Sequence, residues 1–287
     1  MNSGSAMLSG VIVVPCYNEA QRLDLAAWQR FVQAAPGVRL LMVNDGSQDG
    51  TGEMLDRLAS SGRSIRVLHL PANGGKAEAV RQGMLSACST AADFVGFLDA
   101  DLATPWQEVP RFIDVLRRLP HVQVVLGSRL RLLGRDIRRQ RLRRLLGRMF
   151  ALAASRVIGL PLQDTQCGAK LFRRNALLQS SLEQPFASRW IFDVELLARL
   201  KAAYRAAGQG DLVDVAYELP LEQWHEVPGS KLKRSDFLKA IVELAGIYRR
   251  YSRGAPALQP APNEAAIAAK DRAAKSLPTD NELHRAA

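Results

Sequence analysis

Two acids with one small residue between them, Asp99 and Asp101, stand at the end of an apolar run of strand length, 94–98. Such a run is typical of a strand buried in a parallel sheet. At its carboxyl end, two acids that leave water need a positive charge to neutralise them. Mg²⁺ in proteins often takes one or two carboxylates and completes its shell with substrate phosphates. The pair therefore predicts a divalent cation that carries a diphosphate; the alternative is two helix-capping acids in the turn before Trp106.

Polar residues also follow each of three earlier apolar runs, at 11–14, 40–43 and 65–70, which we expect to be strands. These polar segments are Pro15-Cys16-Tyr17-Asn18-Glu19, Asn44-Asp45-Gly46-Ser47-Gln48-Asp49 and Asn73-Gly74-Gly75-Lys76. Ligands of open α/β sheets lie at the carboxyl ends of the strands, so these segments would line one crevice that suits a nucleotide with a metal-bound diphosphate. The sequence contains neither a Gly-x-Gly-x-x-Gly turn after the first strand nor a Walker loop.

The elements that must position these residues alternate between strand and helix. Helical spacing of apolar residues fills the intervals at 23–32, 54–58 and 77–85. Further along, we expect strands over 123–126 and 213–219 and helices over 138–157 and 191–204. This order predicts an α/β fold with a mostly parallel sheet flanked by helices.

A single domain is expected over 10–253, preceded by a flexible segment over 1–9. From 254 to 287 the sequence is rich in Ala and Pro and has almost no large apolar residues, which predicts a mostly disordered tail. The three scattered cysteines match no zinc or redox spacing and favour reduced thiols in the cytoplasm. We expect no signal peptide and no membrane-spanning segment, because the best candidate, 149–162, is short and contains Arg156 and Pro161.

The net charge of +11 is concentrated in one segment. Ten arginines and one acid, Asp136, lie between Arg129 and Arg156. Within 129–157, apolar residues recur at helical spacing: Leu142, Leu145, Leu146, Met149, Phe150 and Ala153. This pattern predicts an amphipathic helix that binds an anionic membrane surface. The alternative is a helix packed on the core with a solvated basic face. Nucleic-acid binding is disfavoured, because interleaved aromatic residues and a known binding module are lacking.

The ordered motifs of the first half resemble those of the family-2 inverting glycosyltransferases with a GT-A fold, a Rossmann-like sheet that binds nucleotide sugars. The motifs in the second half of the sequence resemble, more narrowly, those of the dolichyl-phosphate and polyprenyl-phosphate β-glucosyltransferases. The resemblance covers residues 11–251. Its motifs are Gly127-Ser128-Arg129, Asp164-Thr165-Gln166-Cys167-Gly168-Ala169-Lys170-Leu171-Phe172, Arg189-Trp190-Ile191-Phe192-Asp193-Val194-Glu195 and Gly229-Ser230-Lys231. Several motifs in the right order are more specific than any one of them.

The resemblance implies a role for each matching residue. The nucleotide-sugar site would comprise Pro15, Tyr17, Glu19, Asp45, Lys76, Asp99, Ala100 and Arg129. Asp99 and Asp101 would hold Mg²⁺ or Mn²⁺, with Asp101 the more direct ligand. Ser230 and Lys231, with Arg129, would neutralise the diphosphate or the acceptor phosphate. Asp193 would face the sugar and, with Asp101, form the catalytic pair, while Glu195 would point to another face of its helix.

Alternatives remain open at several of these positions. Asp45-Gly46 and Gly74-Gly75 are also typical of tight turns, and Glu19 of a helix-capping acid. Two departures from the family pattern stand out. Asn44 occupies a position where many relatives have an acid, and Ala103 one where mannosyltransferases can place a Gln metal ligand.

The implied activity is metal-dependent transfer of glucose from UDP-glucose to a polyprenyl phosphate, dolichyl or undecaprenyl, with inversion. It would take place on the cytoplasmic face of a membrane, with the enzyme bound peripherally or recruited by a membrane protein. Three alternatives compete with this interpretation. They are a polyprenyl-phosphate mannosyltransferase that uses GDP-mannose, a sugar nucleotidyltransferase, and a basic membrane adaptor without catalysis.

Overall fold

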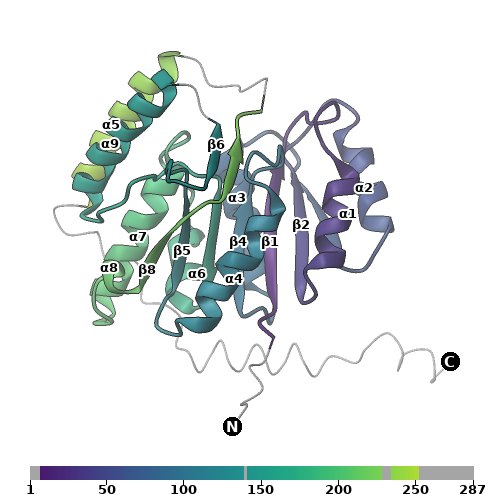
Figure 1. Cartoon of the computed structure of the whole chain (residues 1–287), viewed down its shortest axis with the longest axis horizontal. Helices are drawn as coiled ribbons and strands as arrows, with labels where there is room; N and C mark the ends of the chain where they lie inside the picture. Colours follow the sequence, from purple (N-terminus) through teal and green to yellow (C-terminus); the bar gives the residue numbers. More distant parts are fainter. Residues whose placement is uncertain (1–6, 139–140, 228–233, 252–287) are drawn as a thin grey trace, which may run out of the picture.

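Seven strands form the central sheet of the computed structural model. The structure describes residues 7–138, 141–227 and 234–251 (Figure 1). Their order across the sheet is β3-β2-β1-β4-β7-β5-β8. The strands are β1 Gly10–Cys16, β2 Val38–Asn44, β3 Ile65–His69, β4 Phe94–Leu98, β5 Val124–Ser128, β7 Ala169–Arg173 and β8 Ala216–Pro220. All neighbours are parallel except at β7, which runs antiparallel to both β4 and β5. The expected mostly parallel sheet is confirmed.

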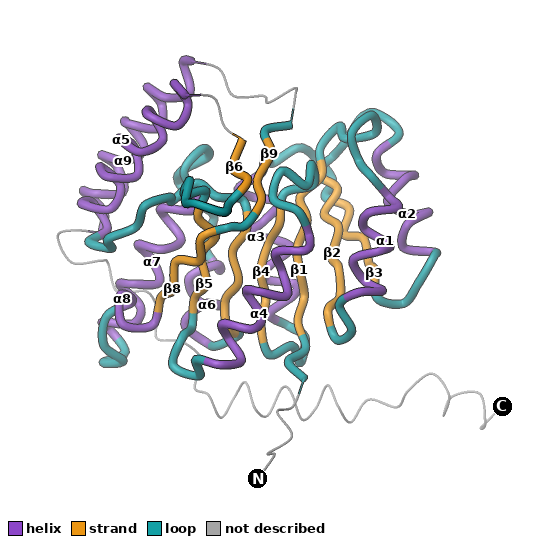
Figure 2. Tube along the Cα trace, in the orientation of Figure 1, coloured by secondary structure: helices purple, strands orange, loops and turns teal. Residues whose placement is uncertain are grey.

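Helices cover both faces of this sheet (Figure 2). They are α1 Leu25–Ala34, α2 Thr51–Ser60, α3 Lys76–Cys88, the 3₁₀ turn Trp106–Glu108, α4 Val109–Arg118, α5 Arg141–Ile158, α6 Ala176–Glu183, α7 Phe192–Ala206, α8 Leu212–Val215 and α9 Arg234–Tyr251. Buried side chains of α1, α2 and α4 pack in one apolar layer, and those of α3, α5, α6, α7 and α9 pack in the other. β1 serves both layers, because Val11 and Val13 face one side while Ile12 and Val14 face the other.

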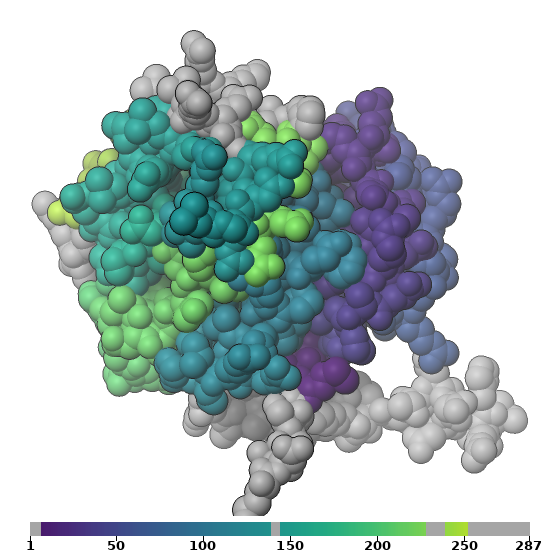
Figure 3. All heavy atoms as spheres, in the orientation of Figure 1, coloured from purple at the N-terminus to yellow at the C-terminus, as the bar shows by residue number. Residues whose placement is uncertain are grey.

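A smaller, two-stranded sheet lies beyond the carboxyl end of β5. It pairs β6, Asp136–Arg138, in parallel with β9, Gln223–His225. The buried Glu108 carboxylate supports this sheet by accepting the backbone N–H groups of Glu222 and Gln223 at 2.7 and 2.9 Å. The first and second halves of the chain lie next to each other on the face seen in Figure 3, with the purple N-terminal elements beside the later teal and green ones.

The expected strands of the first half and their intervening helices are confirmed, and two later boundaries differ. Arg138 ends β6 instead of beginning a helix, because its backbone pairs with His225, and α5 begins at Arg141. Residues 213–215 are helical, because the Asp211 side chain caps α8 by accepting the Val213 N–H, and β8 starts only at Ala216. The helices α4, α6 and α9 and the strands β6, β7 and β9 were not expected from the sequence.

Helices α5 and α9 lie side by side at the β8 end of the molecule, where α5 also contacts α7 (Figure 1). Within the described ranges, none of the helices combines the length and apolarity that crossing a bilayer requires. The disordered tail predicted over 254–287 and residues 1–6 of the flexible segment lie outside the described residues. Ser9, at the end of that segment, is bound to Asp93 through its N–H and Oγ, at 2.7 and 2.9 Å.

Candidate active site

The carboxyl end of β4 delivers the predicted acid pair to the edge of the sheet. The Asp99 carboxylate is 2.5 Å from the Nζ of Lys76, the first residue of α3. Asp101 accepts the N–H of Ala103 at 3.0 Å, and Leu102 between them takes a left-handed conformation with φ +54°. The pKa of Asp101 is raised by burial and, next, by the negative charge of Asp99. The edge therefore carries two close acids and one cation.

Asp45, at the end of β2, anchors the turn that precedes Lys76. Its carboxylate accepts the backbone N–H groups of Gly74 and Gly75 at 2.8 and 2.9 Å and the side-chain amide of Asn73 at 3.1 Å. Position 75 favours glycine, because its φ of +86° is a left-handed conformation that residues with a side chain rarely adopt. Burial raises the pKa of Asp45, against the lowering effect of the two glycine N–H bonds. The expected turn at Gly74-Gly75 is present, and Asp45 places Lys76 beside Asp99.

The segment after β1 is tied to the same edge. The N–H of Asp45 donates to the carbonyl of Cys16 at 2.9 Å, which joins the ends of β1 and β2. Pro15 and Tyr17 flank that bond and are half-buried, and the buried Glu19 accepts Arg22 at 2.6 Å. The fold thus brings Pro15, Tyr17 and Glu19 to the sheet edge that holds Asp45.

Arg129, at the end of β5, is held by Asp164. The Nε and Nη2 atoms of Arg129 donate to the two carboxylate oxygens of Asp164 at 2.6 and 2.8 Å, a bidentate pair. The guanidinium also lies 5.3 Å from the centre of the Trp224 ring. Because one buried carboxylate already neutralises this cation, a phosphate would have to share Arg129 with Asp164.

Asp193 lies in the first turn of α7 and is buried. Its Oδ2 accepts Lys170 Nζ at 2.6 Å. Glu195, two residues on, is used differently: it accepts the N–H of Ser188 at 2.7 Å and the Nη2 of Arg199 at 2.8 Å. Burial lowers the pKa of Lys76, but the charges of Asp99 and then Asp193 outweigh this effect and raise it. Of the two acids in this motif, Asp193 is therefore the one whose charge acts at the sheet edge.

The acid pair suits a divalent cation. Within the described residues, no group of three or more His, Cys, Asp or Glu side chains could jointly hold a metal. Asp99 and Asp101 would thus supply one or two carboxylates and leave the remaining positions to phosphate oxygens and water, the coordination that Mg²⁺ favours. Burial and the negative charge of Asp99 raise the pKa of Asp101, and a cation bound by the two acids would act in the opposite direction.

Three features of the site were not expected from the sequence. Lys170, the partner of Asp193, lies on β7, and Asp164, the partner of Arg129, precedes the same strand. The guanidinium of Arg189 lies against Gly75, since a Cβ at that glycine would come within 3.1 Å of Arg189 Nε. All three residues belong to motifs given in the sequence analysis. The motifs thus indicated the residues, but not which residues pair with each other. Ser230 and Lys231 lie outside the described residues.

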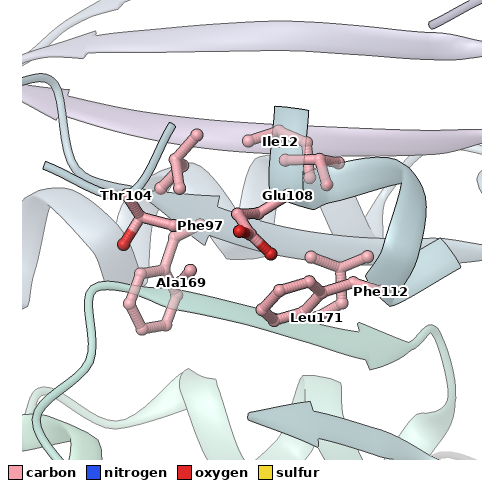
Figure 4. Close-up of a pocket in the computed structure, with 9 residues that line it drawn as sticks. Ile12, Phe97, Thr104, Glu108, Phe112, Ala169 and Leu171 are labelled. Atoms are coloured by element: carbon pink, nitrogen blue, oxygen red, sulfur yellow. The ribbon is translucent and has the colours of Figure 1, made fainter. Parts of the chain in front are cut away.

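The cavity drawn in Figure 4 is separate from this edge. Its lining comes from the interior of the layer between the sheet and α4, with Ile12, Phe97, Phe112 and Leu171 among its residues. It leaves no room for a water molecule. We therefore assign it to the packing of the core.

The chain belongs to glycosyltransferase family 2, because the model of the family described as "Glycosyl transferase family 2" matches residues 11–179. It is a glycosyltransferase with a GT-A fold. The solved structure of glucosyl-3-phosphoglycerate synthase from Mycobacterium tuberculosis in complex with uridine-diphosphate resembles it with a TM-score of 0.57 at 22% identity, covering 88% of this chain and 82% of that chain.

Curated relatives are more similar in sequence. Dolichyl-phosphate beta-glucosyltransferase ALG5C of Trichomonas vaginalis is 34% identical over 247 residues, which is 82% of this chain and 69% of that protein. The human dolichyl-phosphate beta-glucosyltransferase is 30% identical over 266 residues, 85% of this chain and 76% of its own. Polyprenol monophosphomannose synthase of Mycolicibacterium smegmatis is 28% identical over 248 residues, covering 85% and 89%.

Proposed function

We propose that the protein transfers glucose from UDP-glucose to a polyprenyl phosphate, dolichyl or undecaprenyl, with inversion at the anomeric carbon. The observation that carries this proposal is the grouping of Asp99, Asp101 and Lys76 at the carboxyl edge of a glycosyltransferase sheet. The similarity to dolichyl-phosphate beta-glucosyltransferases over more than four-fifths of the chain supports glucose as the sugar and a polyprenyl phosphate as the acceptor.

The departing group of this reaction is a nucleoside diphosphate, whose negative charge must be stabilised. Asp99 and Asp101 would hold Mg²⁺ or Mn²⁺ against it, and such a cation acts as a Lewis acid on the leaving phosphate. Lys76 adds a fixed positive charge beside Asp99. Pro15, Tyr17, Glu19 and Asp45 would border the uridine, with Ala100 lying between the two acids.

The nucleophile is a phosphate oxygen that is already anionic near neutral pH, so the site needs positioning more than a strong base. Asp193 would orient the sugar or the acceptor and accept a proton if the acceptor arrives protonated. Arg129, with Ser230 and Lys231, would neutralise the acceptor phosphate. A single displacement from the face opposite the diphosphate gives the inverted, β-linked product.

Product mass after incubation with a panel of nucleotide sugars and a short polyprenyl phosphate tests the proposal. We expect a hexosyl polyprenyl phosphate from UDP-glucose, lost on chelation of divalent ions and restored by Mg²⁺ or Mn²⁺. The control is the same panel with the acceptor omitted, which separates transfer from donor hydrolysis. No lipid-linked product from any donor would contradict the proposal.

A mannosyltransferase that uses GDP-mannose is the second candidate. The observation in its favour is the similarity to polyprenol monophosphomannose synthase, which extends over 89% of that protein. The two candidates differ in the base of the donor as well as in the sugar. GDP-mannose as the donor with the higher kcat/KM in the same panel would decide for this second function.

An exposed apolar surface on α5 and α9 supports attachment to the membrane that holds the acceptor. Its residues are exposed large apolar side chains of these two adjacent helices, which we together call the α5–α9 surface: Leu145, Met149, Leu152, Ile241, Val242 and Tyr248. Leu145, Met149 and Leu152 follow one helical stripe, and the exposed Arg148 and Arg156 flank it. Phe150 and Ala154 face the core instead, so α5 packs on the protein through one face and leaves a second apolar face exposed.

We propose that this surface rests in the interface of an anionic bilayer, and that the exposed arginines of α5, which include Arg148 and Arg156, lie among the headgroups. Each basic residue close to such a surface contributes about 1 kcal/mol. The variant Leu145→Ser/Met149→Ser/Leu152→Ser should lose co-sedimentation with vesicles that contain anionic lipid. Val213→Ser, at an exposed apolar residue on α8, is the control and should bind as the wild type does. Equal, salt-independent binding of all three proteins would contradict the proposal.

A further inference from the structure

Lys170 is a fully buried lysine at the second position of β7. It pairs in register with Phe97 of β4 and with Leu126 of β5, so its backbone lies in the middle of the sheet. Its Nζ lies 5.3 Å from the centre of the Phe97 ring. Lysines are almost never fully buried unless their charge is paired. The burial of Lys170 therefore requires an explanation.

The Lys170 ammonium has two close acceptors. It donates to the carbonyl oxygen of Cys167 at 2.6 Å and to Oδ2 of Asp193 at 2.6 Å. The first bond fixes the ammonium against the segment that leads into its own strand. The second bond then holds the Asp193 carboxylate of α7 at a defined point above the sheet.

Stability alone does not account for this arrangement. Removing a lysine and an aspartate from water costs free energy that their attraction only partly returns, and an apolar pair of similar volume is often as stable or more stable. The surrounding layer is apolar and includes Phe97, Phe172 and Phe192, which an uncharged pair would join readily. The ion pair therefore points to a use for the orientation of Asp193.

The start of β7 connects this buried pair to the site. The Cys167 carbonyl that Lys170 binds is followed directly by Gly168, whose own carbonyl accepts the Asp99 N–H at 3.2 Å. Gly168 also lies against the Asp99 carboxylate, since a Cβ added there would be 2.0 Å from Oδ2. The ammonium that binds Asp193 is thus held beside the segment that packs on Asp99. We propose that Lys170 is a positioning residue that fixes the Asp193 carboxylate toward the sugar of the bound donor. This inference rests on the proposed glycosyl transfer.

Lys170→Met, which keeps the length of the side chain and removes its charge, tests the inference. We expect kcat for transfer to fall at least about 100-fold, because a catalytic carboxylate loses its fixed position, while the KM for the donor changes less than about threefold. The matched control is Lys201→Met, since Lys201 is also buried on α7 but donates to the Gly159 carbonyl and pairs with Asp211. This control should lose stability and keep kcat per folded molecule.

The double variant Lys170→Met/Asp193→Asn separates positioning from an independent effect. If Lys170 acts through Asp193, the double variant loses no more kcat than Asp193→Asn alone. Additive losses, or a Lys170→Met protein with wild-type kcat, would overturn the inference. Should Lys170→Met fail to fold, Lys170→Gln retains a hydrogen-bond donor without the charge. Its kcat should then fall at least about tenfold, and an unchanged kcat overturns the inference equally.

These rates are measured with whichever donor the wild-type protein uses best, so a donor other than UDP-glucose corrects the proposed function and leaves the test of Lys170 intact. A wild-type protein that transfers no sugar to any polyprenyl phosphate would overturn both claims. An active wild type with an equally active Lys170→Met variant would overturn this inference alone.

Discussion

Gly168 is the residue whose substitution should disturb the site most selectively. It lies directly before β7 and against the end of β4, where its carbonyl accepts the N–H of Asp99 at 3.2 Å. A Cβ added at Gly168 would lie 2.0 Å from Oδ2 and 2.3 Å from Cγ of Asp99. Its three nearest heavy atoms all belong to that carboxylate, so Gly168→Ala acts on Asp99 before it acts on the fold.

The size of the effect follows from the distance. A Cβ essentially never approaches another heavy atom closer than 3.0 Å, so the Asp99 carboxylate must move by about 1 Å. A displacement of that size in a catalytic group costs on the order of 100-fold in rate, which corresponds to about 2.7 kcal/mol of transition-state stabilisation. We expect kcat/KM for the donor to fall by about this factor, because both the Lys76 contact and the cation site depend on that carboxylate.

Stability should change little in the same variant. The Lys76–Asp99 pair is partly exposed, with 46% and 30% of the two side chains accessible, so its loss costs about 1 kcal/mol or less. Replacing glycine lowers the conformational entropy of the unfolded chain, which contributes roughly 0.4–1 kcal/mol in the other direction where the backbone permits alanine. These two effects nearly cancel, and we expect the melting temperature to stay within about 4 °C of the wild type.

Steady-state transfer assays and thermal melts of Gly168→Ala and a control variant test this reasoning. Gly62→Ala is the control, because a Cβ at Gly62 meets nothing within 4 Å. It should match the wild type in rate. A Gly168→Ala protein with wild-type kcat/KM and the wild-type requirement for metal would refute the placement of Asp99 against Gly168 in the working enzyme. A large fall in melting temperature would refute the claim that the substitution spares the fold.

Three further outcomes are expected. Asp101→Asn should lower transfer at saturating Mg²⁺ by about 100- to 1000-fold, and an unchanged rate and metal dependence would contradict its role as a ligand. Asp164→Asn should reduce the free energy of unfolding in urea by about 3 kcal/mol, because it leaves the buried Arg129 guanidinium without its bidentate partner; a variant as stable as the wild type would contradict this. Burial raises the pKa of the Cys167 thiol to about 11, so this cysteine should resist thiol reagents at pH 8 in the native protein and react fully in denaturant. Rapid native labelling of Cys167 would contradict its burial.

The first half of the fold was predictable because its signals are local. The strand at 94–98 is an uninterrupted apolar run, and the structure gives β4 the same bounds. Such runs are buried on both faces, and the polar residues that end them necessarily gather at one edge of a parallel sheet. The position of Asp45, Lys76, Asp99 and Asp101 at that edge follows from the order of strands and helices alone.

The basic segment was predictable in its periodicity and not in its orientation. Apolar residues occupy more than one face of α5, so the sequence does not decide which face packs on the protein. The structure buries Phe150 and exposes Leu145 and Met149. The decision depends on α7 and α9, which contact α5 and come from much later in the chain.

The pairing of Lys170 with Asp193, and of Arg129 with Asp164, was not predictable from the sequence for a topological reason. β7 is short, and Lys170 and Arg173 leave it without the uninterrupted apolar run that marks the buried strands of the first half, so the pattern did not predict a strand there. A strand antiparallel to β4 and β5 begins at the edge where those two strands end. Its first residues and the segment before it therefore return to the site.

That reversal explains why one segment of nine residues, 164–172, serves three separate acids and bases of the site. Asp164 neutralises Arg129 at the end of β5, Gly168 packs on Asp99 at the end of β4, and Lys170 reaches Asp193 on α7. In a wholly parallel sheet, a strand between β4 and β5 would start at the opposite edge, about 15 Å away for a strand of five residues, and could reach none of them. Because β7 is antiparallel, the charged groups at the ends of the neighbouring strands and on α7 have partners at fixed positions.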